Sequence, residues 1–260
     1  MRRLRWLHKA RAVRQNRAKV SGWLPFVLLD PEPDNFTYEI ANLRELAEWT
    51  ATVARSDLGS VEAFLAEPGH DSVLSARLHE STRGHWLWTK RSPAFGKRLG
   101  WYALARIIRP ALIVETGVHD GLGSLLLLRA LQLNHDEGHI GRLVSFDVNP
   151  KAGWLVGQDP LWDLRIQSSR VGLSRAFEEL GQAGMFIYDG WHSYEDERAD
   201  LELAAEHLDP RGVLLSDDAQ VTHALADVCR DRGLAYFDFQ EIPVGHFYPG
   251  AVLGAGRRAA

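Results

Sequence analysis

The sequence has one cysteine, no long apolar run and few residues that bind transition metals through sulfur. Cys229 stands alone among 260 residues, which excludes an intramolecular disulfide and a cysteine-based zinc knuckle. No stretch approaches the roughly 20 consecutive apolar residues that a membrane-spanning helix needs. A composition with 45% hydrophobic and 25% charged residues is typical of an ordinary globular chain. We therefore expect a soluble, cytoplasmic protein without integral membrane insertion.

Acidic residues are absent from the first 19 positions. The rest of the chain carries 22 basic against 34 acidic residues, a net charge of −12, which argues against nucleic acid as the main partner. The basic segment has three interpretations: a solvated helix face on the acidic body, an anchor to an anionic surface, or a targeting segment. Its eight basic residues are Arg2, Arg3, Arg5, Lys9, Arg11, Arg14, Arg17 and Lys19.

Strand-like alternation is missing from residues 1–100. Leu43, Leu46, Trp49 and Val53 recur at three- and four-residue intervals, which predicts a helix. A second helix is expected over residues 60–65, with Ser60 as its cap and Pro68-Gly69 after its end. We interpret residues 1–100 as a helical cap segment.

After residue 100 the sequence changes to short apolar runs separated by helical stretches. Runs at 111–114, 143–146, 185–188 and 213–216 are typical of strands buried on both faces of a parallel sheet, and 234–239 with 251–253 predict an antiparallel pair. Residues 101–260 therefore predict an α/β domain with a doubly wound, mostly parallel Rossmann-like sheet, which we do not expect to fold separately from the helical segment. An acidic residue follows each of the first four runs, and ligands of such sheets bind beyond these strand ends. The four are Glu115, Asp147, Asp189 and Asp217.

A glycine-rich loop connects the first run to an apolar helix. Gly117, Gly121 and Gly123 give the spacing G-x-x-x-G-x-G, which differs from the dinucleotide pattern and suits a zwitterionic ligand without a pyrophosphate. Glu115 could accept from an ammonium group and Asp147 could hold both hydroxyls of a ribose. The alternative is a simple glycine turn with two capping acids.

Three carboxylates are expected on neighbouring strand ends. Asp189, Asp217 and Asp218 would repel one another without a cation or protons, and their oxygen chemistry favours magnesium or calcium. The alternative is that Asp218 caps a helix beginning near Ala219 while Asp217 is solvated.

Over residues 100–255 the sequence resembles the class I S-adenosylmethionine-dependent methyltransferases. The first family motif matches Glu115-Thr116-Gly117 to Gly123-Ser124, and the second matches Asp147. Residues 186–195 and 208–218 are similar to the branch of macrocin-type and sugar O-methyltransferases and cephalosporin hydroxylase-like proteins. The resemblance implies a seven-stranded sheet, and Mg²⁺ or another hard divalent cation on Asp189, Asp217 and Asp218. It also implies S-adenosylmethionine contacts from Glu115, Gly117, Gly121, Ser124, Asp147, Ser169 and Trp191.

The sequence departs from this branch at one position near the fourth run. Trp191 replaces the second Asp of the usual Asp-Gly-Asp-His pattern, and tryptophan cannot accept a proton. We expect Trp191 to stack on the adenine or the acceptor, and His192 to be the catalytic base, with His223 and His246 as rivals. A purely structural role for His192 is the alternative.

The expected activity is transfer of a methyl group to an oxygen of a small hydroxylated molecule, such as a sugar or a glycosylated metabolite. Two other functions stay open: a hydroxylase-like reaction on the same fold, and a non-catalytic binding module. The sequence also leaves open whether the chain forms a homo-oligomer.

Overall fold

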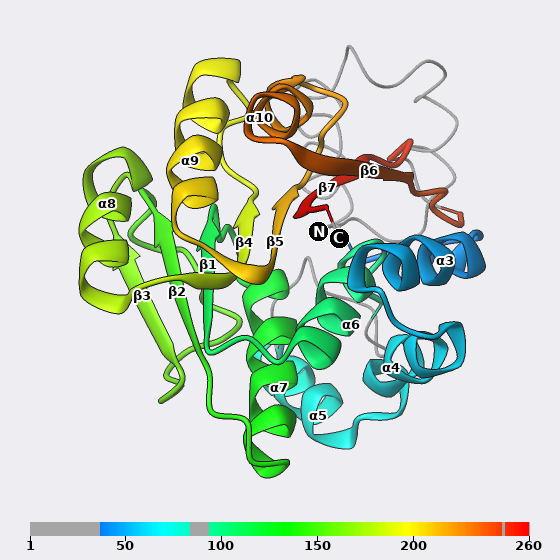
Figure 1. The fold of residues 1–260 in the computed structure, drawn as a ribbon. Coiled ribbons are helices and arrows are strands. Elements are labelled where there is room, and N and C mark those ends of the chain that lie inside the picture. The colour runs from blue at the N-terminus through cyan, green and yellow to red at the C-terminus, as the bar shows by residue number, and fades with distance from the viewer. Residues whose placement is uncertain (1–36, 84–93, 246–247, 260) are drawn as a thin grey trace, which may run out of the picture.

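The computed structural model describes residues 37–83, 94–245 and 248–259 (Figure 1). The basic segment and His246 lie outside these residues. None of the described helices is long and apolar enough to cross a lipid bilayer.

A seven-stranded sheet forms the centre of the molecule, in the order β3-β2-β1-β4-β5-β7-β6 (Figure 1). Five strands are parallel, and β7 pairs antiparallel with both β5 and β6. This confirms the predicted Rossmann-like α/β fold. The strands are β1 (Leu112–Thr116), β2 (Arg142–Asp147), β3 (Trp162–Ile166), β4 (Ala183–Tyr188), β5 (Leu208–Ser216), β6 (Leu234–Gln240) and β7 (Val252–Arg258).

Helices cover both faces of this sheet. One face carries α8 (Ser169–Leu180), α9 (Tyr194–Glu206) and α10 (Ala224–Arg232). The other carries α6 (Arg98–Ile108) and α7 (Leu122–Asp136). The helical segment adds α3 (Leu43–Ala54), α4 (Leu58–His70) and α5 (Ser72–Ser81) on the α6 and α7 side (Figure 1).

Successive side chains of each strand point to opposite faces of the sheet, which therefore separates two hydrophobic cores. Ile113 of β1 and Met185 of β4 point to the side of α6 and α7, whereas Val114 and Phe186 point to the side of α8 and α9. Because both faces of each strand are apolar, the strands appear in the sequence as continuous apolar runs.

The helical segment shares its core with the α/β part. Leu46 and Val53 are fully buried in the same cluster as Leu253 of β7. Trp49 packs against Phe239 of β6 with ring centroids 6.3 Å apart. The boundary drawn at residue 100 falls inside α6, which contacts α3, α4 and α7.

Two local predictions are wrong. Helix α4 begins earlier than expected, because Asp57 is its cap and accepts from the backbone amide of Ser60 at 2.8 Å. It also continues through Pro68, a buried residue in the last turn, where a proline disrupts less of the helix than at its centre. Asp218 caps no helix, since α10 begins only at Ala224.

Candidate active site

The tips of β1, β2 and β4 are joined by backbone hydrogen bonds. The amide of Gly117 donates to the carbonyl of Phe146 at 2.8 Å, and the amide of Asp189 donates to that of Thr116 at 2.7 Å. Gly117 has a φ of 87°, and a Cβ at this position would lie 1.9 Å from the carbonyl oxygen of Asp189. The loop after β1 therefore passes the end of β4 at a distance that only glycine allows.

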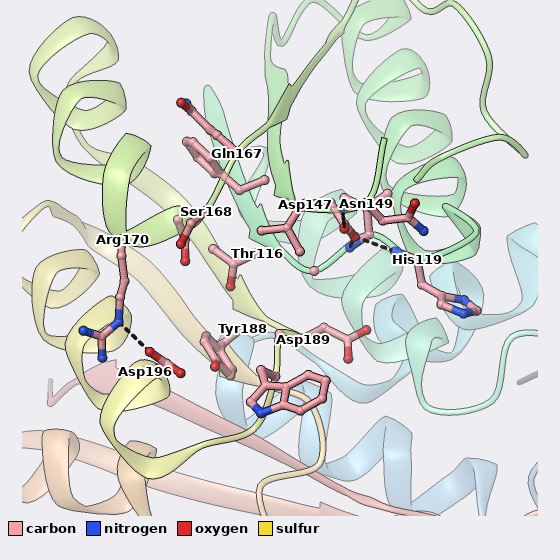
Figure 2. Close-up of a pocket in the computed structure, with 17 residues that line it drawn as sticks. Thr116, His119, Asp147, Asn149, Gln167, Ser168, Arg170, Tyr188, Asp189 and Asp196 are labelled. Atoms are coloured by element: carbon pink, nitrogen blue, oxygen red, sulfur yellow. Dashed lines mark hydrogen bonds and ion pairs between the residues drawn. The ribbon is translucent and has the colours of Figure 1, made fainter. Parts of the chain in front are cut away.

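Asp147 holds the glycine loop in place. Its Oδ2 accepts from the backbone amides of Val118 at 2.8 Å and His119 at 3.0 Å, while Oδ1 accepts from that of Asn149 at 2.8 Å. Figure 2 shows this carboxylate between His119 and Asn149 on the wall of a cavity. Asp147, the residue predicted to bind the ribose, thus lies at the carboxyl end of β2 beside the cavity, and it also orders the loop.

Glu115, Ser124 and Gly121 lie behind this loop and do not line the cavity. The buried Glu115 Oε2 accepts from Ser124 Oγ at 2.6 Å and Ser145 Oγ at 2.8 Å. Burial raises the pKa of Glu115 to about 7, although both serine hydrogen bonds act to lower it. Gly121 caps α7 and approaches Gly153. The cofactor contacts of these three residues stay a prediction, and their positions in the structure support the loop.

The cavity beside Asp147 has a volume of about 450 Å³ and is open at one side. It includes the predicted Gly117, Ser169 and Trp191, and the Trp191 side chain stands at its edge with 88% of the residue exposed. The stretch after β3 forms another wall, with Gln167 and Ser168 (Figure 2). Sequence analysis missed β3 because this edge strand, WDLRI, is only partly buried and lacks a continuous apolar run.

A second cavity of about 220 Å³ adjoins the first. The two share His119, Asp189 and Gly190 as lining residues, so they meet where β1 and β4 end. The predicted base His192 and the predicted metal ligands Asp217 and Asp218 line the second cavity. Its remaining lining residues are Tyr38, Lys97, Arg98 and Tyr248.

His192 lies between two carboxylates. Its Nε2 is 3.7 Å from Asp189 Oδ1 and 3.6 Å from Asp218 Oδ2. Its Nδ1 is buried and has no hydrogen-bond partner. Of the rivals, His223 is exposed at the start of α10 and lines neither cavity, whereas His119 lines both. His119, which the sequence also offers as a catalytic candidate in the glycine loop, is thus the alternative base.

The three aspartates come together as predicted, but two basic side chains come with them. Lys97 Nζ is 3.0 Å from Asp217 Oδ2 and 3.8 Å from Glu241 Oε1. Arg98 Nη2 is 3.9 Å from Asp189 Oδ2. Lys97 and Arg98 lie at the start of α6, far from the acids in sequence. No local sequence motif therefore predicts that they contact the aspartates.

Burial and neighbouring charges both shift pKa values in this cluster. Burial lowers the pKa of Lys97, but the charges of Asp217, Asp218 and Glu241 outweigh it, so that the pKa is raised and the ammonium stays protonated. Burial, and then the charge of Asp217, raise the pKa of Asp189 well above its usual value. Lys97 and Arg98 therefore supply positive charge to this cluster of carboxylates.

This arrangement does not fit the predicted magnesium site. A hard cation needs several carboxylate oxygens at roughly 2.0–2.6 Å. Asp217 Oδ2 faces the Lys97 ammonium, and Asp218 Oδ1 accepts from Tyr248 at 3.0 Å and Gln220 at 2.9 Å. In the part of the chain that the structure describes, no group of three or more metal-binding side chains has the geometry of a metal site.

The central part of the chain is similar in sequence to a known family. Residues 114–219 match the family model of a methyltransferase domain. The match runs from β1 to just beyond β5 and includes the glycine loop, Asp147 and Asp189. These residues are therefore similar to a methyltransferase domain, in agreement with the enzyme class that the sequence motifs predicted.

Solved methyltransferase structures share the fold at low sequence identity. An O-methyltransferase from Bacillus cereus in complex with SAH (S-adenosylhomocysteine) has a TM-score of 0.54 at 16% identity, over 76% of this chain and 100% of that one. The O-methyltransferase TomG from Streptomyces achromogenes, involved in tomaymycin synthesis and in complex with SAM (S-adenosylmethionine), has a TM-score of 0.51 at 18% identity, over 73% and 91%. A Klebsiella pneumoniae protein assigned as an O-methyltransferase has a TM-score of 0.55 at 14% identity, over 73% and 91%.

No curated protein sequence matches the chain. At these identities the solved structures establish the fold alone. The family match does not assign the chain to the sugar-modifying branch.

Proposed function

We propose that the protein transfers the methyl group of S-adenosylmethionine to a hydroxyl oxygen of a small, polar molecule. The observation that carries this proposal is the junction of two cavities at the ends of β1 and β4, one large enough for a nucleoside and the other lined by titratable side chains. The methyltransferase domain match and the SAM- and SAH-bound structures of similar fold support it.

The larger cavity suits S-adenosylmethionine. Asp147 is placed to accept from the ribose hydroxyls, and Ser168, Ser169 and Gln167 offer polar contacts to the adenine. The exposed indole of Trp191 offers a stacking surface at the edge of the cavity. Gly117 exposes backbone close to the junction with the second cavity.

The smaller cavity suits the acceptor. Carboxylates, a histidine and a tyrosine hydroxyl line it, which favours a hydroxylated molecule such as a sugar or a glycosylated metabolite. S-adenosylmethionine supplies a methyl group on a sulfonium ion. The acceptor oxygen forms a bond to that carbon as the carbon–sulfur bond breaks, and His192 takes the hydroxyl proton. Asp189 Oδ1 and Asp218 Oδ2 lie 3.7 Å and 3.6 Å from His192 Nε2 and face this ring nitrogen.

Calorimetric titration of the full chain with S-adenosylmethionine and S-adenosylhomocysteine tests the cofactor. We expect both to bind, and Asp147→Ala to weaken binding by about 2–4 kcal/mol through lost charge-assisted hydrogen bonds and a loosened loop. Asp231→Ala, which removes a surface carboxylate on α10, serves as the control. Equal affinity in Asp147→Ala and wild type would contradict the assignment.

Product analysis tests the reaction type. Incubation with a panel of hydroxylated acceptors is expected to give one S-adenosylhomocysteine for each methyl ether formed. An oxidised product without S-adenosylhomocysteine would instead support the hydroxylase-like alternative.

A further inference from the structure

The ammonium of Lys97 contacts Asp217, one of the three carboxylates on which the resemblance placed a divalent cation. The Lys97 side chain is only 2% exposed and lies against Asp217 and Glu241 at the base of the smaller cavity. An ammonium at 3.0 Å from a buried carboxylate oxygen provides the compensation that a metal would otherwise give.

Both the backbone amide and the side-chain ammonium of Lys97 contact buried carboxylates. The backbone amide of Lys97 donates to Glu241 Oε2 at 3.1 Å. Glu241 Oε1 in turn accepts from the Tyr38 hydroxyl at 2.7 Å and the Ala251 amide at 3.1 Å. Since Glu241 is itself buried, Lys97 cannot move away without leaving two buried carboxylates uncompensated.

One carboxylate oxygen of the cluster is left for the acceptor. Asp217 Oδ1 is buried and has no hydrogen-bond partner, although Oδ2 of the same group faces Lys97. Asp217 lines the smaller cavity. A hydroxyl donor entering that cavity would satisfy this oxygen, whereas a divalent cation would compete with Lys97 for the same carboxylate.

On the basis of the proposed function, we propose that Lys97 replaces the divalent cation of metal-assisted methyltransferases, so that this site works without a metal. Lys97 is then a positioning residue: its contact with Asp217 Oδ2 holds the carboxylate with Oδ1 toward the acceptor. Arg98 provides the second positive charge near Asp189. Removal of the ammonium should convert the acidic cluster into a cation site.

Binding of Mn²⁺ to the full chain, followed by electron paramagnetic resonance, tests this without any need for turnover. We expect wild type to bind Mn²⁺ at most weakly, and the neutral variant Lys97→Met to bind it at least tenfold more tightly. Lys97→Arg should restore wild-type behaviour. Lys151→Met is the matched control, because Lys151 is exposed and is the other lysine within residues 37–83, 94–245 and 248–259.

Three results would overturn the proposal. The first is Mn²⁺ binding to wild type that Asp217→Asn/Asp218→Asn abolishes, which decides the matter even if Lys97→Met does not fold. The second is a folded Lys97→Met protein, judged by circular dichroism, that binds no Mn²⁺. The third is loss of wild-type turnover in excess chelator with recovery on addition of Mg²⁺. Failure of S-adenosylmethionine to bind would contradict the proposed function but would leave the Mn²⁺ result decisive for Lys97.

Discussion

Single residues in this site combine structural and chemical roles. Asp147 orders the glycine loop through three backbone amides and also faces the larger cavity. His192 and His119 both have a positive φ, 54° and 50°, which places their rings beside the strand ends at some conformational cost. A substitution at such a residue can change activity either by removing the side chain or by altering the backbone, so the replacement should tolerate a positive φ.

His192 is the residue on which the proposed proton transfer depends. His192→Asn should reduce kcat by about 10²–10⁴-fold, because asparagine tolerates the left-handed backbone but cannot act as a base at neutral pH. Affinity for S-adenosylmethionine should change little, since His192 does not line the larger cavity. Steady-state kinetics and calorimetry on the same preparation measure both quantities.

The matched control for this variant is His119→Asn, with nearly the same φ and a position between the two cavities. If His119→Asn is inactive while His192→Asn retains turnover, the base is His119. If His223→Ala alone is inactive, the base lies outside both cavities and the proposed geometry is wrong.

At the scale of elements, the apolar runs predicted most strands, including β6 at one edge of the sheet, but not β3 at the other edge. Buried strands such as β1 and β4 are apolar on both faces and were found from the sequence, whereas the partly exposed β3 was not. The glycine loop and the strand-end acids predicted a site at the edge of the sheet where the structure has the two cavities. Lys97 could not be predicted, because its contacts with Asp217 and Glu241 depend on how α6 packs beside β5 and the loop after β6.

The contact between the β1 loop and the end of β4 gives a prediction at this scale. Gly117→Ala should weaken S-adenosylmethionine binding by at least tenfold, because its Cβ would meet the Asp189 carbonyl at 1.9 Å and force the loop away. Gly138→Ala is the matched control. Gly138 has a φ of 89°, but no atom lies within 4 Å of its Cβ position, so it should lose about 1–2 kcal/mol of stability and no affinity.

Thermal unfolding of both glycine variants measures the stability cost of an alanine at positive φ, and calorimetry measures whether the clash at Gly117 also weakens binding. Equal loss of affinity in Gly117→Ala and Gly138→Ala would mean that the close approach of the two strand ends is not needed for binding.

At the scale of the whole molecule, the helical segment completes the core and the smaller cavity. Asn42 Nδ2 donates to the carbonyl of Gln240 at 2.9 Å, and Tyr38 lines the cavity beside Lys97. That this segment does not fold separately stays a prediction. The tertiary contacts between α3, α6 and the β6–β7 pair, which no local pattern encodes, support it.

This shared core predicts a single cooperative unfolding transition. Leu46 is fully buried between α3 and α6, and Leu46→Ala should lower the free energy of unfolding by about 2–5 kcal/mol through the lost apolar contacts and the cavity left behind. Leu43→Ala on the same helix is the control, because Leu43 is 41% exposed and its truncation should cost less than about 1 kcal/mol. Urea unfolding followed by both tryptophan fluorescence and far-ultraviolet circular dichroism should give coincident curves for wild type and for both variants. Two separated transitions, with only the first shifted by Leu46→Ala, would instead show that the helical segment and the α/β part unfold independently.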